Sequence, residues 1–341
     1  MKLPAVFEKY RAEIDAELKL TLAQWQSPLY HMMRYHFGWV DDKGNPLPNP
    51  AGKALRPTLC LLACQAVGGD YHLALPAAAA IELVHNYSLI HDDIQDDDRE
   101  RRHRPTVWSI WGKPQAINAG TAMRLLANVT LLRLRERGAP LEKQLCAQYL
   151  IDETSLRLIE GQYLDISYES RFDISVNDYL SMIEGKTAAL IACSLEIGAL
   201  LGTDDKPVIE SFRDIGRNLG LAFQIRDDII GIWGDNKITG KPLGSDIWRR
   251  KKTFPILYAL EKTGDGLRKE LINVYQNGTV GEKGIVTVLR ILESVGARPQ
   301  AQKTAEKYCH EAIKAINKLA LLASVKYELE EVAHFVVERN F

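Results

Sequence analysis

Acidic residues gather at one point of the chain, in the segment HDDIQDDD. Asp92 and Asp96 are four residues apart, so on a helix they point to the same side, with Asp93 beside them. Carboxylates this close repel one another unless a cation neutralises them. Acidic runs usually form a solvated face. Here, however, a long apolar stretch from Leu75 to Ile90 precedes them and must pack in the core, so we expect the helix to carry these acids inward.

A second acidic cluster follows in FQIRDDIIGIWGD. Gln224, Asp227 and Asp228 share one face of the expected helix. Two carboxylate-bearing helices facing one another would form an all-oxygen cage, which suits Mg²⁺ and not zinc or copper. Mg²⁺ held in this way normally shares its shell with phosphate oxygens. The pair of clusters therefore predicts a substrate that carries a diphosphate.

Basic residues are placed near both acidic clusters, at expected loop and helix ends. Each alone is typical of a protein surface. As two separable sets they indicate two anions, one bridged to carboxylates through metal and another held directly by Lys and Arg. These residues are Lys53, Arg56, Arg101, Arg102, Lys186, Lys241 and Lys251.

Helices are the elements that must position these groups. No proline occurs in residues 141–206 or 256–298, and apolar residues recur there at spacings of three and four. Short β-branched runs and Gly-rich strand-to-helix turns are not found. We expect an all-α chain that forms one domain over residues 1–341, with GDNKITGKPLGSD, residues 234–246, as a functional loop.

The composition excludes several classes of function. With 43 Lys and Arg against 44 Asp and Glu, the net charge is −1, which gives no bulk reason to bind nucleic acid or an anionic membrane. No run approaches the roughly 18 uninterrupted apolar residues of a membrane span. The start MKLPAVFEKYRAEID lacks the pattern of a secretory signal, so we expect a cytoplasmic protein. Five scattered cysteines argue against a disulfide framework.

Taken in order, the motifs resemble those of the trans-isoprenyl diphosphate synthases, also called the polyprenyl synthetase family. GKALRP resembles the family's GGKRLRP, and HNYSLIHDDIQD with RRHRPT resembles its first Asp-rich motif. EGQ at residues 160–162 resembles its central signature, and GKTAAL, FQIRDD, TGKPLGSD and KKTFP follow at fitting intervals. The resemblance runs from about Lys53 to Pro255. It implies the isoprenoid synthase fold, a helical bundle around a deep central cavity, usually as a homodimer.

The resemblance also implies roles for single residues. The direct Mg²⁺ ligands, for about three ions, would be Asp92, Asp96 and Asp227, supported by Asp93, Asp228 and Asp246. The allylic diphosphate would be held by Arg101, Lys186, Thr187, Gln224, Lys241 and Lys251. The diphosphate of isopentenyl diphosphate would be held by Lys53, Arg56, His85 and Arg102. Catalysis is expected to depend most on Asp92, Asp96, Asp227, Arg101 and Lys186.

Two positions depart from the family pattern. Gly231 stands where the second motif usually has a third Asp, which weakens that side of the cage. His103 replaces the usual glycine after the arginine pair, and we interpret it as a tolerated loop variant. Neither position is one of the expected direct ligands.

The implied reaction joins isopentenyl diphosphate to an allylic diphosphate after the allylic C–O bond ionises. Product length would depend on residues one turn before Asp92. There Tyr87 with the small Ser88 resembles synthases that stop at twenty carbons, although Tyr87 can equally be a core aromatic. We expect geranylgeranyl diphosphate as the product, with farnesyl diphosphate as the near alternative.

Three other interpretations stay open at this point. A class I terpene cyclase also ionises a diphosphate with Mg²⁺, but it needs no second diphosphate site, so Lys53, Arg56 and His85 argue against it. A non-catalytic subunit of a heteromeric prenyl synthase typically loses an acidic motif, and Gly231 keeps that alternative in view. A helical protein whose acidic clusters are merely solvated is disfavoured by the ordered series of motifs.

Overall fold

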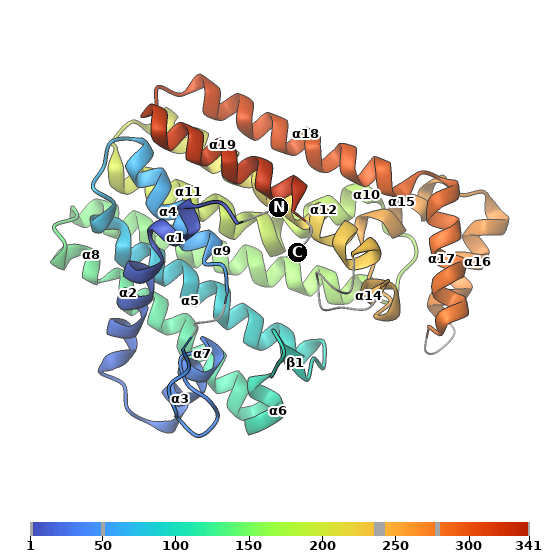
Figure 1. Ribbon diagram of the computed structural model, residues 1–341, viewed down its shortest axis with the longest axis horizontal. Coiled ribbons are helices and arrows are strands. Elements are labelled where there is room, and N and C mark those ends of the chain that lie inside the picture. The colour runs from blue at the N-terminus through green and yellow to red at the C-terminus, as the bar shows by residue number, and fades with distance from the viewer. Residues whose placement is uncertain (1–2, 49–51, 235–242, 277–279, 340–341) are drawn as a thin grey trace. The chain divides into compact units, whose positions relative to one another are not determined.

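The computed structural model of the chain describes residues 3–48, 52–234, 243–276 and 280–339 (Figure 1). Within these ranges the regular structure is helical, apart from one two-stranded antiparallel sheet and an isolated bridge between Val40 and Pro46. The all-α class predicted from the sequence is confirmed.

The chain divides into two compact units, and each is described by itself. Unit 1 comprises Met1–Pro4, Leu156–Ala192 and Ser211–Phe341, and unit 2 comprises Ala5–Ser155 and Cys193–Glu210. Three of the four boundaries fall inside helices, namely α9 (Leu141–Tyr168), α11 (Ala189–Gly202) and α12 (Lys206–Trp233). The single domain expected from the sequence stays a prediction.

Unit 2 is organised around the long helix α5 (Tyr71–Gln95), which packs against α4 and α7. Asp70 caps its N-terminus by accepting a hydrogen bond from the His72 N–H. Four consecutive alanines, residues 77–80, are fully buried, and their small side chains let the neighbouring helices approach closely. The other helices of unit 2 are α1 (Val6–Lys9), α2 (Arg11–Ala23), α3 (Pro28–His36), α4 (Leu55–Ala66), α6 (Val107–Trp111), α7 (Lys113–Leu131) and α8 (Arg133–Glu136).

A short hairpin follows α5 and turns the chain back toward it. Strand β1 (Glu100–Arg101) pairs with β2 (Arg104–Pro105), with Arg101 opposite Arg104. The two turn residues between them, Arg102 and His103, both have positive φ, 52° and 60°. A two-residue turn of this kind favours Asn and Gly, so the hairpin accepts some backbone strain at this point.

Unit 1 is built on α12 from Ser211 onward and on the paired helices α18 and α19, which lie side by side (Figure 1). A side chain at Gly216 or Gly220 of α12 would meet the backbone at Ala192 or Ala188 at 2.6 and 2.4 Å, so these two glycines permit close helix packing. The remaining helices of unit 1 are α10 (Val176–Ile183), the π-helix η1 (Glu184–Ala188), α14 (Ser245–Trp248), α15 (Phe254–Lys262), α16 (Asp265–Gln276), α17 (Glu282–Ser294), α18 (Ala297–Lys318) and α19 (Ala323–Glu338).

Two helical stretches are long and apolar enough to cross a membrane, Tyr71–Gln95 and Val176–Gly202. Their most apolar windows are 72% and 67% buried inside the structure. Core helices of soluble proteins pass the same test, so this is weak evidence for a membrane span.

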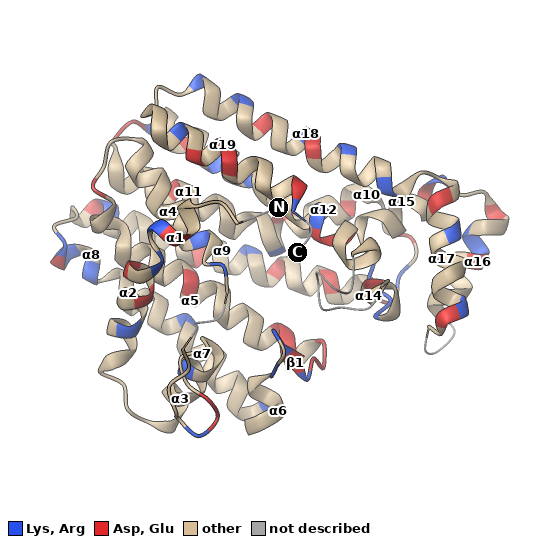
Figure 2. Ribbon diagram, in the orientation of Figure 1, with Lys and Arg blue, Asp and Glu red and all other residues tan. Residues whose placement is uncertain are grey.

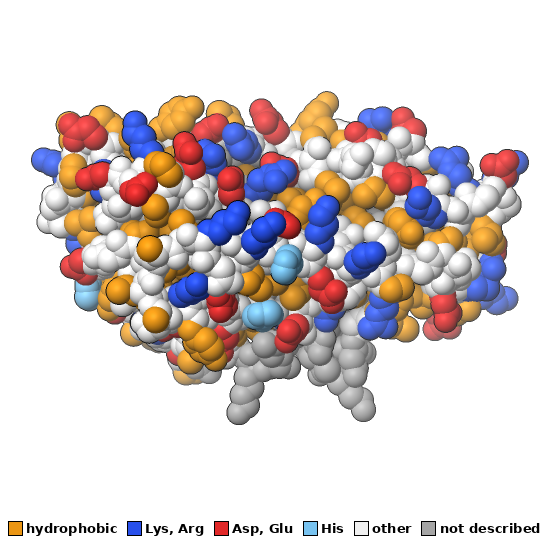
Figure 3. Space-filling view, turned by 90° about the horizontal axis from the view of Figure 1, so that it is seen from above, with side chains coloured by type: hydrophobic (Ala, Val, Ile, Leu, Met, Phe, Trp, Pro, Cys, Tyr) orange, Lys and Arg blue, Asp and Glu red, His pale blue; other side chains and the backbone are white. Residues whose placement is uncertain are grey.

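One face of the molecule shows Lys and Arg interspersed with Asp and Glu and scattered apolar side chains, in keeping with the net charge of −1 (Figure 3).

Candidate active site

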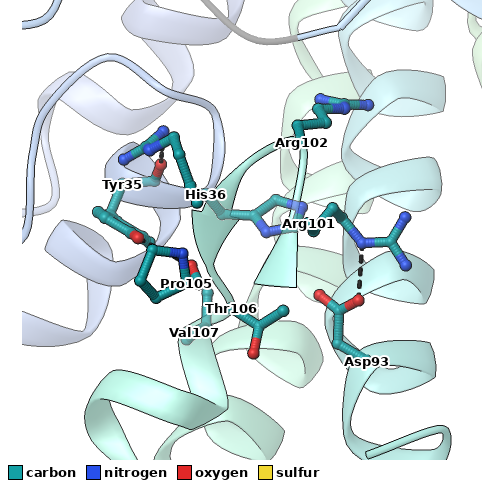
Figure 4. A pocket seen from close by; sticks show the side chains of 9 residues that line it. Tyr35, His36, Asp93, Arg101, Arg102, Pro105, Thr106 and Val107 are labelled. Atoms are coloured by element: carbon teal, nitrogen blue, oxygen red, sulfur yellow. Dashed lines mark hydrogen bonds and ion pairs between the residues drawn. The ribbon is translucent and has the colours of Figure 1, made fainter. Parts of the chain in front are cut away.

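The first acidic motif lies at the C-terminal end of α5, and the ribbon of acidic residues is coloured red beside β1 (Figure 2). Asp92 and Asp96 are partly exposed, whereas Asp93 is buried, with 1% of its surface accessible. The carboxylate Oδ1 of Asp93 accepts a hydrogen bond of 2.7 Å from Arg101 Nε, and Arg101 Nη2 lies 3.9 Å from Asp92 (Figure 4). Burial raises the pKa of Asp93 to about 6, although Arg101 opposes the shift. The hairpin thus brings one arginine onto two of the predicted acidic residues.

A group of cationic side chains surrounds His85, which lies about two turns before Asp92 on α5. Arg56 of α4 donates from Nη1 to His85 Nε2 at 3.3 Å. Burial and the neighbouring Arg56 hold the pKa of His85 well below its ordinary value, so the ring is neutral and accepts this bond. Arg102 lies against Gly52, where a side chain would begin 2.9 Å from its Nη1, and Gly52 has φ +97°. Lys53 follows and is exposed. The second predicted basic set is therefore gathered within unit 2.

Two residues of this region were missed by the sequence analysis. His36, at the end of α3, joins Asp93, Arg101 and Arg102 in lining a small pocket (Figure 4). Burial and the charge of Arg101 lower its pKa to about 3, so it is neutral. Glu82 is buried on α5 and accepts a hydrogen bond of 2.9 Å from Asn86 Nδ2. Glu82 could have been found from the sequence, because it is a charged residue within the apolar run of α5. No local sequence pattern identifies His36.

The predicted chain-length residues are also on α5. Tyr87 is buried, and its ring meets that of His91 edge-on, with centroids 5.7 Å apart. Ser88 Oγ donates to the His85 carbonyl at 2.8 Å. Gly120 of α7 approaches His91 so closely that a Cβ there would lie 2.4 Å from its Nε2. Tyr87 is therefore held by packing of α5 against α7.

The second acidic motif belongs to unit 1, on α12. Asp228 is buried, and its Oδ2 accepts hydrogen bonds from the Tyr179 hydroxyl and, at 2.9 Å, from the Phe254 N–H. Its Oδ1 accepts from Gln224 Nε2 at 3.1 Å. Burial raises the pKa of Asp228 to about 7, which these hydrogen bonds partly oppose. Asp228 thus satisfies the first N–H of α15, and this position suits a supporting role.

Lys186 and Thr187 lie in η1, an irregularity that is common at functional sites. Lys186 Nζ forms an ion pair with Asp165 of α9, a residue that the sequence analysis did not select. Thr187 Oγ1 donates to Gln224 Oε1 at 2.8 Å. Gly161, the centre of the EGQ signature, lies under η1, and a Cβ at this position would come 2.2 Å from the Lys186 nitrogen. The signature glycine therefore sets the position of Lys186.

Asp227 is 40% exposed and pairs with Arg339, near the end of the chain. Asp246 lies on α14 beside Gly231, and the N–H of Lys251 donates to the Asp246 carbonyl at 2.9 Å. Lys241 and most of the expected functional loop lie outside the described residues. Arg339 was missed because it is separated from Asp227 by 112 positions and no local pattern marks it.

The predicted metal ligands are all carboxylates. Within the described ranges no three His, Cys, Asp or Glu side chains are close enough to hold a metal ion by themselves. Mg²⁺ is usually bound by one or two carboxylates and completes its shell with water and substrate phosphates, so this donor set suits it. The buried Oδ2 of Asp93 has no hydrogen-bond partner in the described part of the chain, which leaves an acceptor atom for such a shell.

Comparison with known proteins places these features in context. A model of the polyprenyl synthetase family matches residues 38–292. The chain is 40% identical to the (2E,6E)-farnesyl diphosphate synthase of Mycobacterium tuberculosis, over 94% of this chain and 90% of the relative. It is 37% identical to a geranylgeranyl diphosphate synthase of the same organism, over 92% and 88%. The crystal structure of a polyprenyl synthetase from Streptomyces coelicolor is similar, with TM-score 0.89 and 36% identity over 97% and 98% of the two chains.

Proposed function

We propose that this chain, which belongs to the polyprenyl synthetase family, is a trans-prenyltransferase that condenses isopentenyl diphosphate with dimethylallyl, geranyl or farnesyl diphosphate. The observation that carries the proposal is the pairing of Arg56 with the neutral His85, close to Arg102 and apart from the Asp93–Arg101 pair. This group provides for a second anion. A terpene cyclase has no use for it, and a non-catalytic subunit would have no reason to keep it beside the first acidic motif.

The acidic residues would hold Mg²⁺, about three ions, together with the substrate diphosphate. The proposed ligands are Asp92, Asp96 and Asp227, with Asp93, Asp228 and Asp246 in supporting positions. When bound, Mg²⁺ acts as a Lewis acid on the diphosphate oxygens and stabilises the charge that develops on them.

The basic residues divide the work of holding the two substrates. Arg101, Lys186 and Gln224, with Thr187, Lys241 and Lys251, would orient the allylic diphosphate and stabilise it as it leaves. Lys53, Arg56, His85 and Arg102 would hold isopentenyl diphosphate at attack distance.

The reaction breaks one bond, forms another and releases a proton. The allylic C1–O bond breaks and its electron pair leaves with the diphosphate. The double bond of isopentenyl diphosphate then attacks C1, which forms the new C–C bond. Loss of a proton from C2 of the isopentenyl unit restores a double bond, and the released diphosphate can accept that proton. The protein supplies no nucleophile, and apolar walls exclude the water that would quench the cation.

For the product we propose geranylgeranyl diphosphate, with farnesyl diphosphate as the alternative. The buried Tyr87 beside Ser88 supports a short chain, because an aromatic ring held by packing against His91 is a rigid obstacle to a growing chain. Relatives named for both products are among those similar to this chain.

We propose that the protein acts as a homodimer in the cytoplasm. Helix α9 exposes two groups of large apolar residues, each at spacings of three or four: Leu141, Leu145 and Tyr149 in unit 2, and Leu156, Ile159, Tyr163 and Ile166 in unit 1. In unit 2, α7 lies beside α9 through the Arg124–Asp152 ion pair and exposes Leu125 and Val129, 62% and 40% accessible. Exposed apolar groups of this kind are typical of a surface that a second copy covers. Light scattering after size-exclusion chromatography would measure the mass, and a monomer would contradict the proposal.

Incubation of the purified protein with Mg²⁺, isopentenyl diphosphate and geranyl or farnesyl diphosphate tests the function. We expect chromatography to show an extended prenyl diphosphate that is lost with EDTA and returns with added Mg²⁺. Asp92→Asn should abolish turnover. Asp97→Asn is the matched control, because Asp97 lies in the same acidic run, is 71% exposed and pairs with Lys113 at the surface. An absence of extended product would overturn the proposal.

A further inference from the structure

The space beside Gly231 is filled by a carboxylate from another segment. A Cβ at Gly231 would lie 2.0 Å from Asp246 Oδ2, 2.5 Å from its Cγ and 2.9 Å from its Oδ1. Real side chains do not approach this closely, so any residue larger than glycine at position 231 must displace Asp246. The Asp246 carboxylate can lie here only because residue 231 of α12 has no side chain.

Position 231 belongs to the same face of α12 as the motif aspartates. It lies four residues after Asp227 and three after Asp228, so a side chain there would stand next to both on the helix surface. The Asp246 carboxylate occupies the point at which that side chain would begin. A third carboxylate is therefore present on this face, although the sequence of α12 does not encode it.

Backbone contacts hold Asp246 in this position. Ser245 Oγ donates to the Gly231 carbonyl at 3.0 Å, and the Gly244 N–H donates to the Ile232 carbonyl at 3.1 Å. Gly244 has φ +72°, a conformation that turns the chain onto α12 and that glycine adopts without strain. These contacts come from the two residues immediately before Asp246, so the backbone that carries its side chain is held against α12.

The charge of Asp246 is felt by the groups around the motif. Its charge contributes to the raised pKa of Asp228, and it also raises the pKa of the Tyr179 and Tyr275 hydroxyls. In each case burial is the larger cause. Because the Asp246 carboxylate occupies the side-chain position of Gly231, three residues after Asp228, it is a neighbour of Asp228 on this face of α12.

We propose that Asp246 supplies the third carboxylate of the second acidic motif, and that Gly231 is the positioning residue that makes room for it. The proposal rests on the proposed function, since it assigns the carboxylate to the magnesium diphosphate site. It also links two predicted site residues, because the Lys251 N–H donates to the Asp246 carbonyl at 2.9 Å. A side chain at position 231 would displace Asp246 and move Lys251 with it.

Exchange of the two residues tests the proposal. Calorimetry would measure the binding of inorganic pyrophosphate to the full-length protein at several Mg²⁺ concentrations, without turnover. Gly231→Ala, Gly231→Asp and Asp246→Asn should each raise the Mg²⁺ concentration for half-maximal binding by roughly 10- to 100-fold. The double variant Gly231→Asp with Asp246→Gly returns a third carboxylate to the same space, so it should recover most of the loss.

Gly266→Ala on α16 is the matched control, because a Cβ there meets nothing within 4 Å. Melting temperatures in EDTA, measured by circular dichroism, show whether each variant is folded. Asp246→Asn keeps the shape of the side chain and should melt like the wild type. The proposal is wrong if Asp246→Asn binds pyrophosphate with the Mg²⁺ dependence of the wild type, or if the double variant is no better than Gly231→Asp. A wild type that binds Mg²⁺ and pyrophosphate but makes no prenyl product would instead count against the proposed function.

Discussion

Arg339 binds Asp227 of the second acidic motif, although the two residues of unit 1 are 112 positions apart in the sequence. Its Nη2 donates to the Asp227 carboxylate and, at 3.2 Å, to the Phe223 carbonyl. The guanidinium lies 4.0 Å from the centroid of the Phe223 ring. Arg226, the residue before Asp227 on α12, donates to the Arg339 carbonyl at 2.8 Å. A buried arginine thus orients a carboxylate that is itself partly exposed.

We therefore expect Arg339→Ala to affect both stability and metal response. Loss of charge-assisted hydrogen bonds from a side chain that is 5% exposed should lower the free energy of unfolding by about 2 kcal/mol. The Mg²⁺ concentration for half-maximal activity should rise, because Asp227 loses its orientation. Urea unfolding and Mg²⁺ titration measure the two effects. Arg290→Ala, which removes an exposed ion pair with Glu270, is the control and should change neither by much.

A side chain at Gly161 should disturb the position of Lys186 in η1. A Cβ added at Gly161 would lie only 2.2 Å from the Lys186 backbone nitrogen. Gly161→Ala should therefore displace η1, lower kcat and destabilise unit 1 by about 1–3 kcal/mol through overpacking. Steady-state kinetics and thermal unfolding measure these changes. Gly266→Ala should leave both unchanged, and an unaffected kcat in Gly161→Ala would show that η1 does not depend on this contact.

Lys252 should make stability depend on pH in the alkaline range. Its amine is buried, donates to the Glu169 carbonyl at 2.8 Å and lies 4.1 Å from the Phe172 ring centroid. Burial lowers its pKa to about 8, so the folded state binds the proton less tightly than the unfolded state. Between this value and the unfolded pKa near 10.4, the unfolded state carries more protons, and the free energy of unfolding rises with pH.

The comparison of wild type with Lys252→Met isolates this effect. The stability of the wild type relative to the variant should increase by on the order of 3 kcal/mol from pH 8 to above pH 10.4, and should be level below pH 8. Urea unfolding at a series of pH values measures it. Lys262→Met is the control, because Lys262 is exposed. A flat difference across the range would contradict the assignment of the shift to the buried amine.

Local patterns explain which parts of the site could be predicted. The spacing of Asp92 and Asp96, and of Gln224 and Asp228, depends only on helix periodicity, and the long apolar tracts ensure that these helices form. The sequence pattern therefore placed both acidic motifs on α5 and α12, where the structure has them.

Contacts between distant segments explain the rest. Asp228 accepts a hydrogen bond from the N-terminus of α15. The N-cap residue Thr253 makes no side-chain cap there, so the Phe254 N–H needs another acceptor. Arg339 reaches Asp227 only because α19 packs back within unit 1. Gly231 was expected to weaken one side of the cage, yet its neighbour in space is a carboxylate from α14. None of these pairings follows from a local rule, because each depends on how helices pack.

Tyr87 should set the product length if the chain grows along α5. Replacing it by Ala removes a buried ring that packs against His91 and opens space one turn before Asp92. We expect longer prenyl diphosphates, measured by reversed-phase chromatography of the dephosphorylated products. Tyr87→Phe is the matched control and should keep the wild-type product, because it retains the ring. An unchanged product from Tyr87→Ala would remove this residue from the cavity floor and leave the transferase assignment intact.

His103 offers a prediction about strain in the hairpin that carries Arg101. Its φ of 60° is costly for a residue with a Cβ and costs nothing for glycine. His103→Gly should therefore raise the free energy of unfolding, by up to about 1 kcal/mol after the greater freedom of glycine in the unfolded chain is subtracted. His103→Ala is the control, because it removes the imidazole and keeps the strain. Equal stability of the two variants in urea unfolding would show that the turn is not strained at this residue.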